Sequence, residues 1–445
     1  MSDRTYWLSS GFYTMMHRGI DFVLGFVGFM LLVRILSPND FGVWVLLITI
    51  TAIVDMARNG FLQNGLIKFL VNQDATNRAK IQGAALWLNA LLTGIFIALL
   101  WIFADRAESL FNAPGLAEIL KIFTAILPVL VLHTHNLVLM QATYDFKAYF
   151  FAGVSKSLPL FLFILYFFWN PDALTLSRLA WIQNLTFAMA TLMSAYQVKA
   201  HFRVIWGWHR EWAIQIFHFG KYVFGTNLIS MLTNSLDKFL LGALLSPVQV
   251  ALANTAGRVM NMVEIPVNSI ASISYPKASE AYDKGKIKEV AAIYEKTLGM
   301  MLSITLPFWV INLLFAEYII LFIAGEEYLD AAPFLRIVAL IALIKPLDRQ
   351  AGVFLDAIGK PFFNMIMVFG TFVYGAALSY VFIQRFGLMG AAYGLVLAVG
   401  ITAVIKQFIL ARFLPIRLGR ALLAGIRYYP ELLGLILSKL KRKGK

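Results

Sequence analysis

Long apolar segments recur along the whole chain and leave little sequence for a soluble domain. Read in windows of about 19 residues, apolar segments lie at 12–36, 40–64, 81–104, 118–141, 150–169, 176–198, 217–243, 248–274, 298–323, 332–356, 362–384 and 388–411. A membrane-spanning helix needs about 20 such residues, and the segments lack the alternation of a transmembrane β-strand. The sequence therefore predicts an all-α polytopic membrane protein with about twelve transmembrane helices.

The composition excludes several functional classes. Only 14% of the residues are charged, against about 25% in soluble proteins. The net charge of +14 is scattered between the apolar segments and gathered at the C-terminus, which favours anionic lipid over nucleic acid as the partner. The chain has no Cys, so disulfides, thiolate nucleophiles and cysteine zinc sites are excluded. His133 and His135 point about 200° apart on a helix, and we expect no metal site.

Charges between the segments predict the orientation. The second, sixth and eighth segments are followed by clusters of basic residues, whereas the odd-numbered segments are followed by few basic residues. The clustered residues are Lys68, Arg78, Lys80, Lys199, Arg203, Arg210, Lys277, Lys284, Lys286 and Lys288. By the positive-inside rule both termini are cytoplasmic. The first ten residues lack signal-peptide features, so the first segment is expected to be a retained anchor. The basic tail, 414–445, is expected to be an interfacial amphipathic helix.

An internal repeat suggests a duplicated architecture. Leu36-Ser37-Pro38 recurs as Leu245-Ser246-Pro247, an offset of 209. At the same offset Asp55 aligns with Glu264, Asn59 with Asn268 and Lys68 with Lys277. Six helices per half give parallel repeats. The predicted parts are an N-terminal lobe at 1–198, a cytoplasmic linker at 199–216, a C-terminal lobe at 217–413 and the tail at 414–445.

Charged side chains inside apolar segments are the candidate functional residues, because each costs about 2.5 to 3.5 kcal/mol on insertion scales. The expected pairs are Arg18–Asp21, Asp55–Arg58, Asp237–Lys238 and Asp348 with either Lys345 or Arg349; Arg34, Arg336 and Lys406 are assigned to snorkelling. Each pair could equally be a structural bridge. The basic residues that remain after this pairing favour phosphate or pyrophosphate as the bound ligand. Candidates for sugar hydroxyls, or for interhelical hydrogen bonds, are Asn227, Asn234, Asn254, Asn261 and Asn268.

Four sequence stretches carry a family resemblance. They are Leu32–Trp44, reading LVRILSPNDFGVW, Leu236–Gly242, reading LDKFLLG, Thr255–Arg258, reading TAGR, and Tyr275–Ser279, reading YPKAS. In these stretches the chain resembles the polysaccharide-exporting flippases of the multidrug/oligosaccharidyl-lipid/polysaccharide superfamily, often called Wzx-type O-antigen or repeat-unit flippases. Asp237, Lys238 and Arg258 match that family's positions in the seventh and eighth helices.

The resemblance implies two six-helix lobes around a central cavity, as in the MATE-like fold. It implies alternating access that moves an undecaprenyl-pyrophosphate-type lipid-linked glycan to the outer leaflet of the bacterial inner membrane, coupled to H⁺ or Na⁺, with membrane lipids and polysaccharide polymerase machinery as further partners. The expected substrate-binding residues are Arg18, Arg58, Lys221, Lys238, Arg258 and Arg349, and the expected ion-coupling acids are Asp21, Asp55, Asp237 and Glu264. We expect no catalytic residue and no cofactor.

Two other functions fit the sequence less well. A cation-coupled drug or metabolite antiporter of the same superfamily would use the intramembrane acids to bind H⁺ or Na⁺. A membrane glycan polymerase or ligase would be expected to need a sizeable outer loop, and the odd-numbered connections here are short. A transporter is therefore predicted rather than an enzyme.

Overall fold

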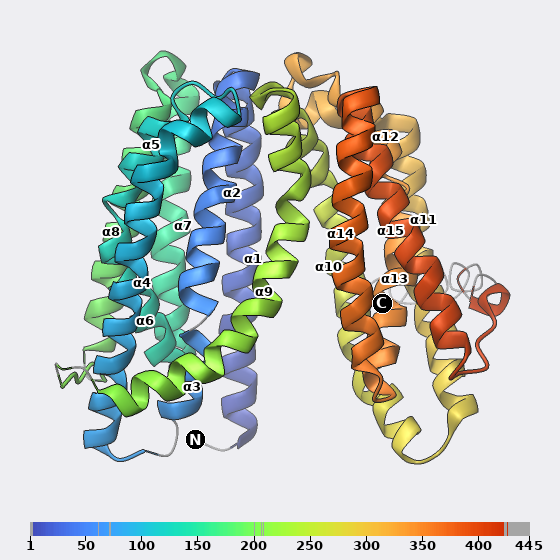
Figure 1. The fold of residues 1–445 in the computed structure, drawn as a ribbon, viewed down its shortest axis with the longest axis horizontal. Helices are drawn as coiled ribbons and strands as arrows, with labels where there is room; N and C mark the ends of the chain where they lie inside the picture. The colour runs from blue at the N-terminus through green and yellow to red at the C-terminus, as the bar shows by residue number, and fades with distance from the viewer. Residues whose placement is uncertain are drawn as a thin grey trace, which may run out of the picture. The chain divides into compact units, whose positions relative to one another are not determined.

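The computed structural model describes residues 3–60, 62–70, 73–199, 201–205, 207, 209–421 and 425. Every regular element over these residues is helical (Figure 1). The α-helices are α1 (Asp3–Ile35), α2 (Pro38–Gly60), α3 (Gln63–Leu70), α4 (Ala75–Leu110), α5 (Leu116–Thr124), α6 (Leu127–Ala142), α7 (Phe146–Trp169), α8 (Leu176–Val198), α9 (Arg210–Leu244), α10 (Pro247–Asp283), α11 (Ile287–Ala324), α12 (Ala331–Val338), α13 (Ile341–Ala357), α14 (Pro361–Phe386) and α15 (Leu388–Ala411). Two short 3₁₀ turns, η1 (Pro171–Ala173) and η2 (Glu326–Tyr328), complete the list. The all-α prediction is confirmed.

Each predicted apolar segment falls on one helix or on two consecutive helices. The segment at 118–141 is broken into α5 and α6, which meet at a bend of 56°. Pro128 stands in the first turn of α6, where its missing N–H and fixed φ suit a helix start rather than an interior. The segment at 332–356 is likewise divided into α12 and α13.

Several of the helices have the length and the apolar composition of membrane spans. Among the described residues six helices are long and apolar enough to cross a membrane, or seven if the bent pair α5 and α6 counts as one span. Helices α1, α9 and α10, which carry most of the candidate charges, are not among the helices so identified in the described part of the chain. The chain is a multi-pass membrane protein, and its count of twelve spans stays a prediction.

Helix boundaries repeat at the sequence offset of 209. Helix α1 ends at Ile35 and α9 at Leu244, while α2 begins at Pro38 and α10 at Pro247 (244 − 35 = 247 − 38 = 209). Helix α2 also approaches the second Ser-Pro turn closely, because a Cβ atom built on Gly42 would lie 1.8 Å from the carbonyl oxygen of Pro247. Only glycine permits so close a backbone approach, which gives Gly42 of the FGVW stretch a packing role.

The helices group into two compact units. Unit 1 comprises residues 1–235 and 246–251, and unit 2 comprises residues 236–245 and 252–445. In unit 1, α7 packs against α1 and α8, and α6 packs against α3, α4 and α8. A cluster of buried apolar side chains that includes Leu66, Ile81 and Leu139 joins α3, α4, α6, α7 and α8. The predicted lobe limits at 198 and 217 stay a prediction.

In unit 2 the consecutive helices α14 and α15 pack against each other (Figure 1). A Cβ atom on Gly390 would lie 2.0 Å from the carbonyl oxygen of Phe382, and one on Gly394 would lie 2.8 Å from the Cα of Ser379. The Gly390 and Gly394 spacing therefore marks close helix packing, as its pattern predicts. A core around Tyr294 and Phe354 joins α11 and α13. The predicted amphipathic tail lies largely outside the described residues.

Candidate functional site

An ion pair on α2 organises the polar interior of unit 1. The Nη2 atom of Arg58 lies 3.0 Å from the Oδ1 atom of Asp55. Its Nη1 atom donates to the Oγ1 atom of Thr93, 3.4 Å away, and to the carbonyl oxygen of Leu127, 3.3 Å away. The Arg58 side chain is 0% exposed, whereas that of Asp55 is 34% exposed. Since Leu127 is the first residue of α6, the guanidinium ties α2 to α4 and to the bend between α5 and α6.

The predicted Asp55–Arg58 pair is confirmed, and its network continues beyond Arg58. The hydroxyl of Thr93 donates to the Oδ1 atom of Asn89, 3.4 Å away, and the Nδ2 atom of Asn89 donates to the Oγ1 atom of Thr134, also 3.4 Å away. These bonds are long for their kind. They connect the ion pair to the wall of a cavity.

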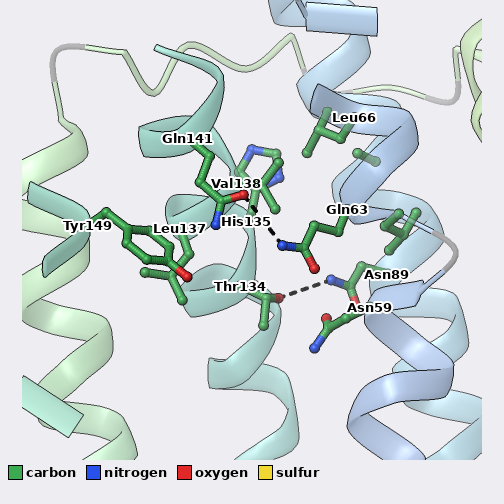
Figure 2. A pocket seen from close by; sticks show the side chains of 12 residues that line it. Asn59, Gln63, Leu66, Asn89, Thr134, His135, Leu137, Val138, Gln141 and Tyr149 are labelled. Atoms are coloured by element: carbon green, nitrogen blue, oxygen red, sulfur yellow. Dashed lines mark hydrogen bonds between the residues drawn. The ribbon is translucent and has the colours of Figure 1, made fainter. Parts of the chain in front are cut away.

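That cavity, which we name the amide pocket, has a volume of about 230 Å³. It lies among α2, α3, α4, α6 and α7 (Figure 2). Its lining residues are Asn59, Leu62, Gln63, Leu66, Ala85, Asn89, Thr134, His135, Leu137, Val138, Gln141 and Tyr149. In Figure 2 the amide groups of Gln63 and Gln141 face each other, with the Nε2 atom of Gln63 3.5 Å from the Oε1 atom of Gln141. No charged side chain is among these described lining residues.

The predicted Arg18–Asp21 pair is wrong. Asp21 instead lies 3.2 Å from the Nε2 atom of His17, one turn earlier on α1. The His17 ring packs against Tyr149 of α7 and sits directly over Gly153, where a Cβ atom would lie 1.7 Å from its Nε2 atom. Arg18 points to the exposed face of α1. Packing against α7 therefore selects His17, because the absent side chain at Gly153 makes room for its ring.

In unit 2 the structure brings three family-matched residues together. Asp237, Lys238 and Arg258 lie close enough for the charge of Lys238 to interact with both neighbours. All three side chains are half-buried. The Oγ atom of Ser379 on α14 donates to the Oδ1 atom of Asp237, 3.2 Å away. The anchor of Asp237 is thus a hydroxyl of another helix, and the charge of Lys238 acts on it as well.

Two ion pairs link α13 to its neighbours in unit 2. The Nζ atom of Lys345 lies 2.9 Å from the Oε1 atom of Glu264 on α10, and the Nζ atom of Lys406 on α15 lies 2.7 Å from the Oδ1 atom of Asp348. The expected partners of Asp348, Lys345 and Arg349, are therefore wrong. So is the snorkelling role of Lys406, whose side chain is 5% exposed.

The remaining basic residues occupy less enclosed places. Lys221 is half-buried on α9, and Arg349 is exposed on α13. Arg336 forms an ion pair with Glu317 at 2.8 Å, both side chains being exposed, and its snorkelling stays a prediction. Sequence reasoning also missed His17, Asn89 and Gln141. Their one available signal is that each is a polar residue inside an apolar segment.

Comparisons with known proteins identify a family and a shared fold. Residues 31–333, more than half of the chain, match the family model described as "Polysaccharide biosynthesis protein". The chain is 22% identical over 399 residues to the "Putative O-antigen transporter" of Shigella flexneri, covering 86% of this chain and 92% of that protein. It is also 22% identical over 399 residues to the lipopolysaccharide biosynthesis protein WzxC of Escherichia coli K12, covering 87% and 77% respectively.

Solved structures share the fold. An inward-facing multidrug resistance MATE family transporter of the MOP superfamily superposes with a TM-score of 0.75 at 16% identity, covering 88% of this chain and 95% of that one. The lipid II flippase MurJ, in an inward closed conformation, superposes with a TM-score of 0.76 at 13% identity, covering 95% and 92%. The family match extends over the Ser-Pro turns and the cluster of Asp237, Lys238 and Arg258, and by it the chain belongs to the polysaccharide biosynthesis protein family.

Proposed function

We propose that this protein is a flippase that moves an isoprenoid-pyrophosphate-linked oligosaccharide from the cytoplasmic to the outer leaflet of the bacterial inner membrane. The proposal includes alternating access and coupling to an H⁺ or Na⁺ gradient. Membership of the polysaccharide biosynthesis protein family and similarity to an O-antigen transporter support it. The MOP-superfamily fold is compatible with it.

The observation that carries the proposal is the cluster of Lys238 and Arg258 in unit 2. Two cations within electrostatic range of each other repel, and their half-buried position weakens the screening by water. A pyrophosphate placed between them would relieve that repulsion, because Arg binds phosphate oxygens in a bidentate manner and Lys adds a point charge. The anion would thus gain more from this cluster than from either cation alone.

The acids have different partners, which suggests different roles. Asp55 and Glu264 each lie in an ion pair with a cation of the protein. Asp21 lies beside His17, and Asp237 accepts a hydrogen bond from a hydroxyl. We propose Asp237 as the coupling acid, because protonation there would change the charge beside Lys238 without breaking a direct ion pair. The roles of Arg18, Lys221 and Arg349 in substrate binding, the polymerase partner and the cytoplasmic position of both termini are parts of the same proposal.

A transport assay tests the proposal. The native protein and Arg258→Ala are placed in liposomes with a fluorescent isoprenoid-pyrophosphate oligosaccharide, and translocation is measured by the accessibility of the glycan to a membrane-impermeant enzyme. Arg385→Ala, which alters an exposed arginine in the last turn of α14, is the matched control. We expect translocation by the native and control proteins and its loss in Arg258→Ala. Absence of native translocation by folded protein would refute the flippase and favour the drug or metabolite antiporter.

A further inference from the structure

We propose that the amide pocket of unit 1 binds one uncharged sugar ring of the transported glycan. This inference rests on the proposed function and adds a second recognition site, distinct from the cluster of Lys238 and Arg258 in unit 2.

The chemistry of the lining matches that of a sugar ring. Side-chain amides of Asn59, Gln63, Asn89 and Gln141 each present donors and an acceptor. Sugar hydroxyls also donate and accept, so the two sets are complementary in either orientation. Tyr149 adds an aromatic ring at the pocket wall (Figure 2), and an aromatic face suits the C–H groups of a pyranose.

The pocket retains hydrogen-bonding capacity that the protein does not use. His135 is 3% exposed, and among the described residues its Nε2 atom has no hydrogen-bond partner. The bonds that cross the pocket, Gln63 to Gln141 at 3.5 Å and Asn89 to Thr134 at 3.4 Å, are near the upper limit for hydrogen bonds. Replacing such long hydrogen bonds by bonds to a ligand hydroxyl costs little free energy. A ligand hydroxyl that reaches His135 would in addition give a hydrogen-bond partner to its buried Nε2 atom.

The volume selects the size of the ligand. About 230 Å³ corresponds to roughly seven or eight waters at about 30 Å³ each. A single bare cation would leave most of this space unfilled, whereas one hexose ring would fill it. The half-buried side chains of Asn59, Gln63, Gln141 and Tyr149 line the pocket alongside the buried Asn89 and His135, so a ring could enter past partly exposed groups.

The absence of charge in the described lining predicts the class of sugar. A uronic acid would bring a carboxylate into a site without a lining cation, and desolvation of that carboxylate would be uncompensated. The nearest arginine on α2, Arg58, already binds Asp55, Thr93 and Leu127. We therefore infer a preference for a neutral ring over an acidic one.

The lack of native cysteine permits a direct binding test. Gln63→Cys places a single thiol at the pocket, Gln141→Cys provides a second position on α6, and Gln384→Cys on the exposed face of α14 is the control. Each variant, in liposomes, is labelled with a small uncharged thiol reagent. The probes are isoprenyl pyrophosphate alone, the same carrier with a neutral glucose disaccharide, and the same carrier with a disaccharide that ends in glucuronic acid.

We expect the neutral glycan carrier to slow labelling at both pocket positions by a factor of 1 + [L]/Kd, about fivefold at about four times Kd. The sugar-free and acidic carriers should leave the rate unchanged, as should all three probes at the control position. Equal protection by the sugar-free carrier, or no protection by any probe, would overturn the sugar site. Equal protection by the acidic carrier would overturn its neutrality. Carrier flipping by the native protein is measured in parallel, so that its absence refutes the proposed function separately.

Discussion

The ion pair of Asp55 and Arg58 allows a prediction about which partner is more costly to remove. Arg58 is fully buried, whereas a third of the Asp55 side chain reaches solvent. Arg58→Met removes one bond to a carboxylate, worth about 1.5–3 kcal/mol, and two longer bonds to neutral acceptors, worth about 0.5 kcal/mol each. The abandoned carboxylate of Asp55 can be hydrated. We therefore expect a loss of about 3 kcal/mol in the free energy of unfolding.

The reverse change should cost more. Asp55→Leu leaves a guanidinium buried without its counterion, a situation that costs about 3–5 kcal/mol. In the double variant no charge is left alone, so its loss should be smaller than the sum of the two single losses. This order follows from the difference in burial, and a surface ion pair would not produce it.

Thermal unfolding of the purified protein, followed by tryptophan fluorescence, measures the effect. At about 2–4 °C per kcal/mol for a unit of this size, Arg58→Met should lower the melting temperature by roughly 6–12 °C. Arg385→Met is the control, because Arg385 is exposed on α14. A melting temperature of Asp55→Leu above that of Arg58→Met would refute this order. So would melting temperatures of both variants equal to that of the control.

Two further changes test contacts that the fold creates. Lys406→Met removes a nearly buried cation 2.7 Å from Asp348 and should lower the free energy of unfolding by about 3 kcal/mol. Adding Asp348→Asn to this variant should recover part of the loss, as measured by chemical denaturation of the two single variants and the double variant. If the losses of the two single variants simply add in the double variant, the two side chains do not form a direct pair. Gly42→Ala would place a Cβ atom 1.8 Å from the Pro247 carbonyl and should reduce the yield of folded protein in size-exclusion chromatography, whereas Gly19→Ala, where nothing lies within 4 Å, should not.

Sequence patterns determined which parts of the chain are helical. Hydropathy is a sum over neighbouring residues, so each apolar segment predicts its own helix without knowledge of the others. The repeated Leu-Ser-Pro turn is equally local, and it correctly anticipated equivalent ends for α1 and α9. Even the Asp55–Arg58 pair follows from a spacing of three residues on one helix.

The tertiary structure alone decided which polar groups meet. Asp21 binds His17 rather than Arg18 because the imidazole fits over Gly153 of another helix. Lys406 pairs with Asp348 because α15 packs against α13. The amide pocket likewise needs α2, α3, α4, α6 and α7 side by side. Electrostatic and hydrogen-bond energies depend on distances between helices, and those distances are set by the packing of the whole unit rather than by any local stretch of sequence.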